Sequence, residues 1–178
     1  MEGVWVFVAA DMAFFAMLFV SFALARRDQS ALFESGRQAL NRDLGGINTL
    51  ILLTSSWCVA MAVEAAQRNQ HKALQRSLWG ALLCAVAFGI SKAFEYTHEL
   101  RAGITPLTND FFMYYFTLSG IHFVHVIAGA VVLGVMLQRA RSGAYNREDH
   151  RGLEVGATYW HMVDLLWVMI FPLLYLLR

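Results

Sequence analysis

The sequence has few charged residues, few prolines and few cysteines. Asp, Glu, Lys and Arg make up 15% of its 178 residues, against about 25% in soluble domains, which argues against a soluble fold. The net charge of +1 gives no basic surface for nucleic acid. The two prolines leave long stretches free to form helices. The two cysteines, Cys58 and Cys84, lie inside apolar runs, so we expect small packing residues rather than a disulfide or a metal site.

Long apolar runs are the main feature of the sequence. Hydrophobic residues make up 58% of the chain, and the mean hydropathy is +0.48. Five runs reach the length of about 20 residues that a helix needs to cross about 30 Å of hydrocarbon. We therefore predict an all-α, polytopic membrane protein, a bundle of five transmembrane helices in one domain over residues 1–178. The predicted helices cover about 4–25, 45–66, 74–96, 111–137 and 156–177.

The chain's start and its loop charges bear on topology. The first apolar run begins at Val4 without a basic segment or a cleavage site, so we expect a retained helix rather than a signal peptide. The side of the N-terminus carries seven basic residues and the other side six, so the positive-inside rule favours a cytoplasmic N-terminus by a narrow margin. The first set is Arg68, Lys72, Arg76, Arg139, Arg141, Arg147 and Arg151; the second is Arg26, Arg27, Arg37, Arg42, Arg101 and Arg178.

Asp11 lies inside the first predicted span, and Lys92 and Glu95 lie inside the third. A charged group at the membrane centre costs roughly 2.5–3.5 kcal/mol on insertion scales, so such groups have partners or functions. Asp11 is either a proton-exchanging carboxyl or a carboxyl paired for assembly. Lys92 and Glu95 are three residues apart on one helix, which predicts an internal ion pair. Contact of Glu95 with a neighbouring helix or a lipid ammonium is the alternative.

Two further pairs at the same spacing lie in the fourth and fifth spans: His122 with His125, and His161 with Asp164. We expect His122 or His125 to hydrogen-bond Asp164 or Glu95, which would fix helix register at about 0.6 kcal/mol per bond. A proton relay through these groups is a second possibility. A third is a membrane metalloenzyme in which the two pairs bind zinc or iron, although di-iron bundles use more carboxylates. A transporter is disfavoured because no inverted repeat or broken helix pair is visible.

Five stretches follow one another along the chain: ADMAFF at 10–15, INT at 47–49, KAFEY at 92–96, GIHFVHVIAG at 120–129 and YWHMVDLLW at 159–167. In order and spacing they resemble subunit III of the haem–copper cytochrome c oxidases. The resemblance implies a non-catalytic accessory subunit of a bacterial inner-membrane oxidase. Such a subunit carries no haem or metal of its own, docks on the catalytic subunit I and supports proton uptake into it.

The resemblance also implies two departures from longer family members. Those have seven helices and bind phospholipid in a V-shaped cleft; this chain resembles the last five helices, so one arm of that cleft is not expected. Asp11 occupies the place of a membrane-buried glutamate known for its reaction with carbodiimides. Five-helix relatives include the NorE-type accessory protein of nitric oxide reductase, which is the alternative association.

Overall fold

Helices make up nearly all of the computed structural model, which describes residues 2–177. The elements in order are α1 (Glu2–Asp28), α2 (Ser30–Ala39), α3 (Arg42–Gln67), α4 (His71–Arg101), α5 (Asp110–Arg141), α6 (Arg151–Phe171) and a π-helical turn, η1 (Pro172–Leu176). Five segments are long and apolar enough to cross a membrane. They are α1, α3, α4, α5, and α6 together with η1. The predicted all-α architecture with five spans is therefore confirmed, and the protein is a multi-pass membrane protein.

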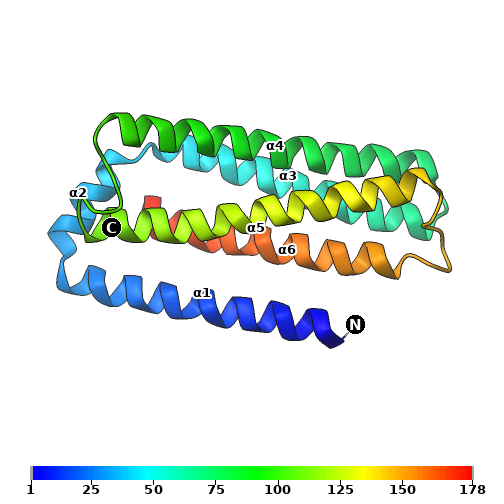
Figure 1. Ribbon diagram of the computed structural model, residues 1–178, viewed down its shortest axis with the longest axis horizontal. Helices are drawn as coiled ribbons and strands as arrows, with labels where there is room; N and C mark the ends of the chain where they lie inside the picture. Colours follow the sequence, from blue (N-terminus) through cyan, green and yellow to red (C-terminus); the bar gives the residue numbers. More distant parts are fainter. Residues whose placement is uncertain (1, 178) are drawn as a thin grey trace.

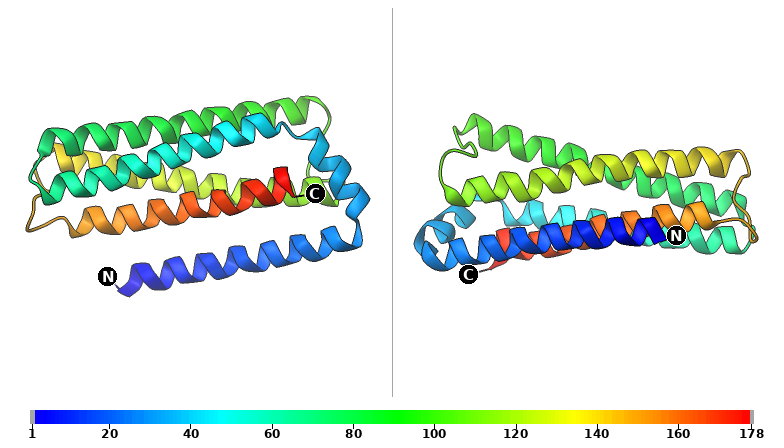
Figure 2. Two further views of the ribbon diagram at one scale, coloured as in Figure 1. Left: turned by 180° about the vertical axis from the view of Figure 1, so that it is seen from behind. Right: turned by 60° about the horizontal axis from the view of Figure 1, so that its bottom comes forward.

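Helices α3 to α6 form a bundle of nearly parallel rods, and α1 lies along its outer edge (Figures 1 and 2). α1 packs against α5 and α6. In the most apolar 18-residue window of α1, 11% of the residues are buried inside the protein. The corresponding window of the span that contains α6 is 50% buried. Most of the α1 surface, including Trp5, Met17 and Val20, is therefore exposed. In a membrane this surface meets lipid or another polypeptide.

The short helix α2 lies across one end of the bundle, beside η1 and the turn that joins α4 to α5 (Figure 1). It is amphipathic, and it buries Phe33, Gly36 and Arg37. Phe33 packs its ring edge-on against Phe22 and Phe111. The polar segment between the first two spans therefore contains a short helix. Its buried face packs against α5 and η1 at this end of the bundle.

Asparagine residues mark where two of the spans begin and where the chain turns between α3 and α4. Asn41 and Asn109 cap α3 and α5, and their side-chain oxygens accept the N–H groups of Leu44 at 3.1 Å and Phe112 at 2.9 Å. At the opposite end, Asn69 adopts a left-handed conformation (φ 56°) in the turn from α3 to α4. Its side chain accepts the N–H of Arg147 at 2.8 Å. This bond ties the α3–α4 turn to the loop that joins α5 to α6.

Candidate functional site

A fully buried ion pair lies inside the bundle near its α2 end. Lys92 Nζ donates to Glu95 Oε2 at 2.9 Å, and the two side chains are 0% and 3% exposed. The pair predicted from the three-residue spacing is therefore present. Glu95 Oε1 accepts hydrogen bonds from the hydroxyls of Tyr115, at 2.9 Å, and Tyr175. Lys92 Nζ also donates to the Tyr175 hydroxyl at 3.1 Å. Both charges are thus hydrogen-bonded, which buried ions require.

Four aromatic rings surround the Lys92 ammonium and complete its environment. Nζ lies 5.1–5.7 Å from the ring centroids of Tyr96, Tyr115, Trp167 and Tyr175. At these distances the ring faces attract a cation, and they do so most strongly where water is excluded. The rings come from α4, α5, α6 and η1. We call these residues, with Lys92 and Glu95, the aromatic cage; it joins three of the five spans.

The π-helical turn brings Tyr175 into the aromatic cage. Pro172 follows α6 directly and has no N–H to continue the helical ladder. The backbone continues instead as a π-turn, in which Leu177 N–H donates to the Pro172 carbonyl at 2.9 Å. Tyr175 is fully buried there. The role of Pro172 and Tyr175 was missed from the sequence, because nothing in the local pattern gives the direction of a side chain after such a turn.

A second polar site joins α1 to the bundle. His125 Nε2 lies 3.1 Å from Asp11 Oδ2, and the two side chains are 17% and 18% exposed. The His125 ring also contacts Phe15 edge-on, with 5.6 Å between ring centroids. On α6, the Tyr159 hydroxyl donates to the His125 carbonyl at 3.4 Å. Asp11 therefore has a specific partner, and it keeps partial access to its surroundings.

The hydrogen bonds around His125 define its contact with Asp11. Nδ1 lies 2.8 Å from the Ile121 carbonyl, which can only accept, so Nδ1 carries a hydrogen. His125 Nε2 then faces Asp11 Oδ2, and the lone pairs of these two atoms would repel each other if neither carried a hydrogen. One proton must therefore lie between them, on the imidazole or on the carboxyl. Asp11 and His125 therefore form a hydrogen bond between α1 and α5.

The other predicted network residues contact different groups from those expected. His122 Nε2 donates to the Val163 carbonyl at 3.1 Å, and its Nδ1 has no partner among residues 2–177. His161 Nδ1 bonds the Ser56 hydroxyl of α3 at 2.7 Å. Asp164 is 3% exposed, and no described group is in hydrogen-bonding geometry with its oxygens, although Ser56 is nearby. The expectation that His122 or His125 would bond Asp164 or Glu95 was wrong.

Helix geometry explains these different partners. Residues three apart share one broad face of a helix but still differ by about 60° in direction. His122 and His125 can therefore reach different neighbouring helices. His122 reaches α6 while His125 reaches α1. Within the described part of the chain, no three His, Cys, Asp or Glu side chains converge to hold a metal ion. The four groups of the metalloenzyme alternative are thus not brought together.

The family model "Cytochrome c oxidase subunit III" matches residues 1–177 of this chain. The chain belongs to the cytochrome c oxidase subunit III family. It is 34% identical to cytochrome c oxidase subunit 3 of Synechocystis over 99% of its own length and 75% of that protein. It is 30% identical to the Thermostichus vulcanus protein of the same name, over 98% and 86%. A heme-copper oxidase subunit I+III of Aeropyrum pernix is 29% identical over 98% of this chain and 22% of that protein.

Membership of the subunit III family fixes the class of the protein. Subunit III is a non-catalytic subunit of an oxidoreductase complex, so the chain is an accessory subunit of a haem–copper oxidase. The two polar sites, the aromatic cage and the Asp11–His125 pair, are then features of a supporting subunit. The cage has no access to substrate because its charges are buried, whereas the Asp11–His125 pair is partly open.

Proposed function

We propose that this subunit docks on the catalytic subunit I of a bacterial haem–copper oxidase and helps to supply it with protons. The subunit carries no cofactor of its own and lies in the cell membrane with its N-terminus in the cytoplasm. The observation that carries the proposal is the contact of His125 Nε2 with Asp11 Oδ2 at 3.1 Å, at a partly exposed place between α1 and α5.

Docking on subunit I is supported by the relative from Aeropyrum pernix, whose name joins subunits I and III in one chain. The peripheral helix α1 presents a mostly exposed apolar surface that a membrane-embedded partner or lipid can cover. The matched family and the named relatives are oxidases, which favours this association over that with nitric oxide reductase.

The position of Asp11 suits transfer from the cytoplasmic face. It follows the first residue of α1 by nine positions, which is roughly 13 Å along a helix at 1.5 Å per residue. A proton bound there has entered the membrane only part of the way. The neighbouring His125 imidazole is a hydrogen-bond partner for Asp11 at this depth.

Replacing Asp11 by Asn is expected to slow steady-state proton uptake by the oxidase while its haem content stays unchanged. The amide cannot exchange the proton that the pair shares. His125→Asn is expected to give the same defect, and the double variant should be no slower than either single one. Proton uptake and oxygen consumption of the purified complex in vesicles measure this.

Asp28→Asn is the matched control, since Asp28 is an exposed acid at the other end of α1. It should leave uptake unchanged. Normal uptake and turnover in Asp11→Asn, with the subunit still bound, would contradict a proton-carrying role. Loss of the subunit from the complex in Asp11→Asn would make the pair an assembly contact instead.

A further inference from the structure

The loop that joins α5 to α6 is held by hydrogen bonds within itself and to a neighbouring turn. Asn146 Oδ1 accepts the N–H groups of Glu148 and Asp149, both at 2.8 Å. A backbone N–H of the loop donates to the Asn69 side chain in the α3–α4 turn. The loop ends at His150, the residue that caps α6, at the same end of the bundle as the start of α1 (Figure 1). The conformation of this loop therefore determines how α6 begins.

The His150 imidazole joins the loop to the first turn of α6. Its Nδ1 is hydrogen-bonded to the Asn146 carbonyl at 3.1 Å, and its Nε2 lies 3.3 Å from Glu154 Oε1, within ion-pair distance. The side chains of His150 and Glu154 are 18% and 38% exposed. The N–H groups of Leu153 and Glu154 also donate to the His150 carbonyl, at 2.9 and 3.1 Å. One residue thus contacts the loop through one ring nitrogen and the helix through the other.

Both oxygen atoms that the His150 ring contacts are hydrogen-bond acceptors. A carbonyl oxygen can only accept, and so can an ionised carboxylate. The imidazolium ring carries a hydrogen on each nitrogen, so it can serve both oxygens at once. A neutral imidazole carries one hydrogen and leaves one of the two contacts without it. The observed arrangement therefore fits the protonated ring, and histidine is the side chain that ordinarily changes charge between about pH 5 and 8.

The charged groups around His150 come from three elements. They are Arg147, Glu148 and Asp149 of the loop, Arg151 and Glu154 of α6, and Glu64 and Arg68 of α3. Arg147 and Arg68 line a hollow of about 650 Å³ together with His150, and their charges oppose the imidazolium. Arg68 is itself paired with Glu64 at 2.6 Å. The acids of this set outnumber the bases by one, and one of them contacts the ring directly, so the surroundings favour the cation.

We propose that His150 is a pH-dependent latch between the α5–α6 loop and the first turn of α6. The protonated ring holds Asn146 and Glu154 together, so the latch is closed on the acid side. When the pH rises and the ring loses its proton, one of the two contacts is lost and the loop separates from the helix. A higher proton concentration at this end of the bundle thus orders the start of α6. The latch does not depend on the proton role of Asp11.

Hydrogen–deuterium exchange of the purified complex at about pH 6 and about pH 8 tests the latch. After correction for the intrinsic pH dependence of amide exchange, protection of residues 148–156 should fall at least about tenfold at the higher pH, because a hydrogen bond to a charged group is lost. His150→Gln carries no titrating ring and should show the lower protection at both pH values. Glu154→Gln removes the carboxylate and should lower the protection at about pH 6 toward the alkaline level.

His71→Gln is the matched control, because His71 is an exposed histidine at the start of α4, at the same end of the bundle. It should keep the full pH response of residues 148–156. A loop whose corrected protection is the same at both pH values would overturn the proposal. The same pH response in His150→Gln as in the unaltered complex would also overturn it.

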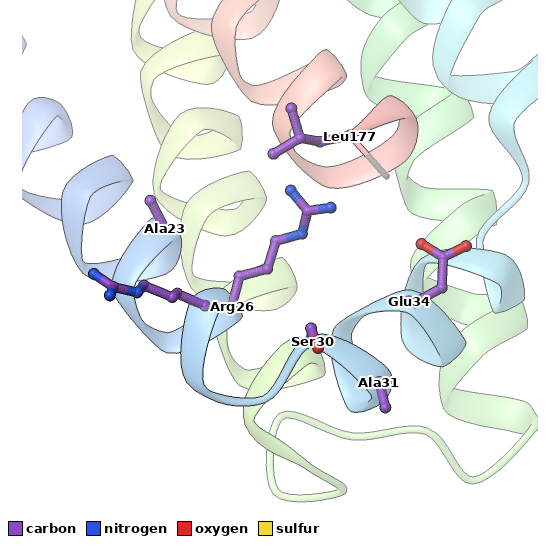
Figure 3. A pocket seen from close by; sticks show the side chains of 7 residues that line it. Ala23, Arg26, Ser30, Ala31, Glu34 and Leu177 are labelled. Carbon is purple, nitrogen blue, oxygen red and sulfur yellow. The ribbon is translucent and has the colours of Figure 1, made fainter.

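The opposite end of the bundle is the internal reference for the same measurement. Helix α2 contains no histidine, and the hollow beside it is lined by the charged side chains of Arg26, Arg27 and Glu34 (Figure 3). Arginine and glutamate ordinarily keep their charge between about pH 5 and 8. The corrected exchange of α2 should therefore stay constant. An equal loss of protection in α2 would show that the whole subunit loosens with pH, and it would contradict a local latch at His150.

Discussion

Replacing Lys92 by Met is expected to lower the free energy of unfolding by about 3–5 kcal/mol, the usual cost of removing one partner from a buried ion pair. Lys92 is fully buried and its ammonium contacts Glu95 at 2.9 Å. Without that cation, the carboxylate of Glu95 keeps only the hydroxyls of Tyr115 and Tyr175. The four aromatic rings also lose the cation that they surround. The loss should appear as a lower denaturation midpoint in mixed micelles and a lower yield of the folded chain.

The double variant Lys92→Met/Glu95→Leu separates the charge from the packing. Replacing a whole buried pair by apolar side chains is often neutral or stabilising, so the double variant should be more stable than Lys92→Met alone. Lys72→Met, at an exposed lysine on the same helix, should change stability by less than about 0.5 kcal/mol. If Lys92→Met matched the unaltered protein, the ion pair would not stabilise the bundle.

Gly129→Ala is expected to destabilise the bundle by about 1–3 kcal/mol, the usual cost of an extra carbon in a well-packed core. A Cβ at this position of α5 would lie 2.6 Å from ring carbons of Trp160, which is fully buried on α6. The large ring cannot move without displacing its neighbours. Tyr159, 3.6 Å from the added carbon, would shift as well, and it supports the carbonyl of His125.

Gly134→Ala is the matched control on the same helix, because a Cβ there meets nothing within 4 Å. Alanine is the better helix former by up to about 1 kcal/mol, so this change should be neutral or stabilising. Trp160→Phe combined with Gly129→Ala should recover part of the loss by making room. Equal unfolding midpoints for the two alanine variants would show that α5 and α6 do not pack as closely as described.

The spans and the internal ion pair could be predicted because each depends on local sequence. Twenty apolar residues define a crossing helix, and the three-residue spacing of Lys92 and Glu95 places both on one helix face. Both features hold whatever the neighbouring helices do. The same reasoning applied to His122 and His125 gave the wrong partners, because those partners are set by which helices pack around α5.

The remaining features of the two sites depend on tertiary structure. Asp11 pairs with His125, 114 residues away, only because α1 lies against α5 and α6. Tyr175 reaches Glu95 because Pro172 changes the hydrogen-bonding pattern after α6. Asp164 remains unbonded within residues 2–177, although its depth and spacing suggested a role in the network. Such contacts could not be predicted from residue spacing, because spacing does not determine which neighbouring helix a side chain contacts.

The central claim is that this chain supports a haem-bearing catalytic subunit and that its own ionisable groups serve packing and proton exchange rather than metal binding. The most direct measurement is gentle purification of the tagged chain from its native membrane, followed by a reduced-minus-oxidised visible spectrum and metal analysis of the separated chain. We expect haem bands from a co-purified subunit I and no stoichiometric metal on this chain. A chain that purifies without haem, or that retains one equivalent of zinc or iron after separation, would contradict the account.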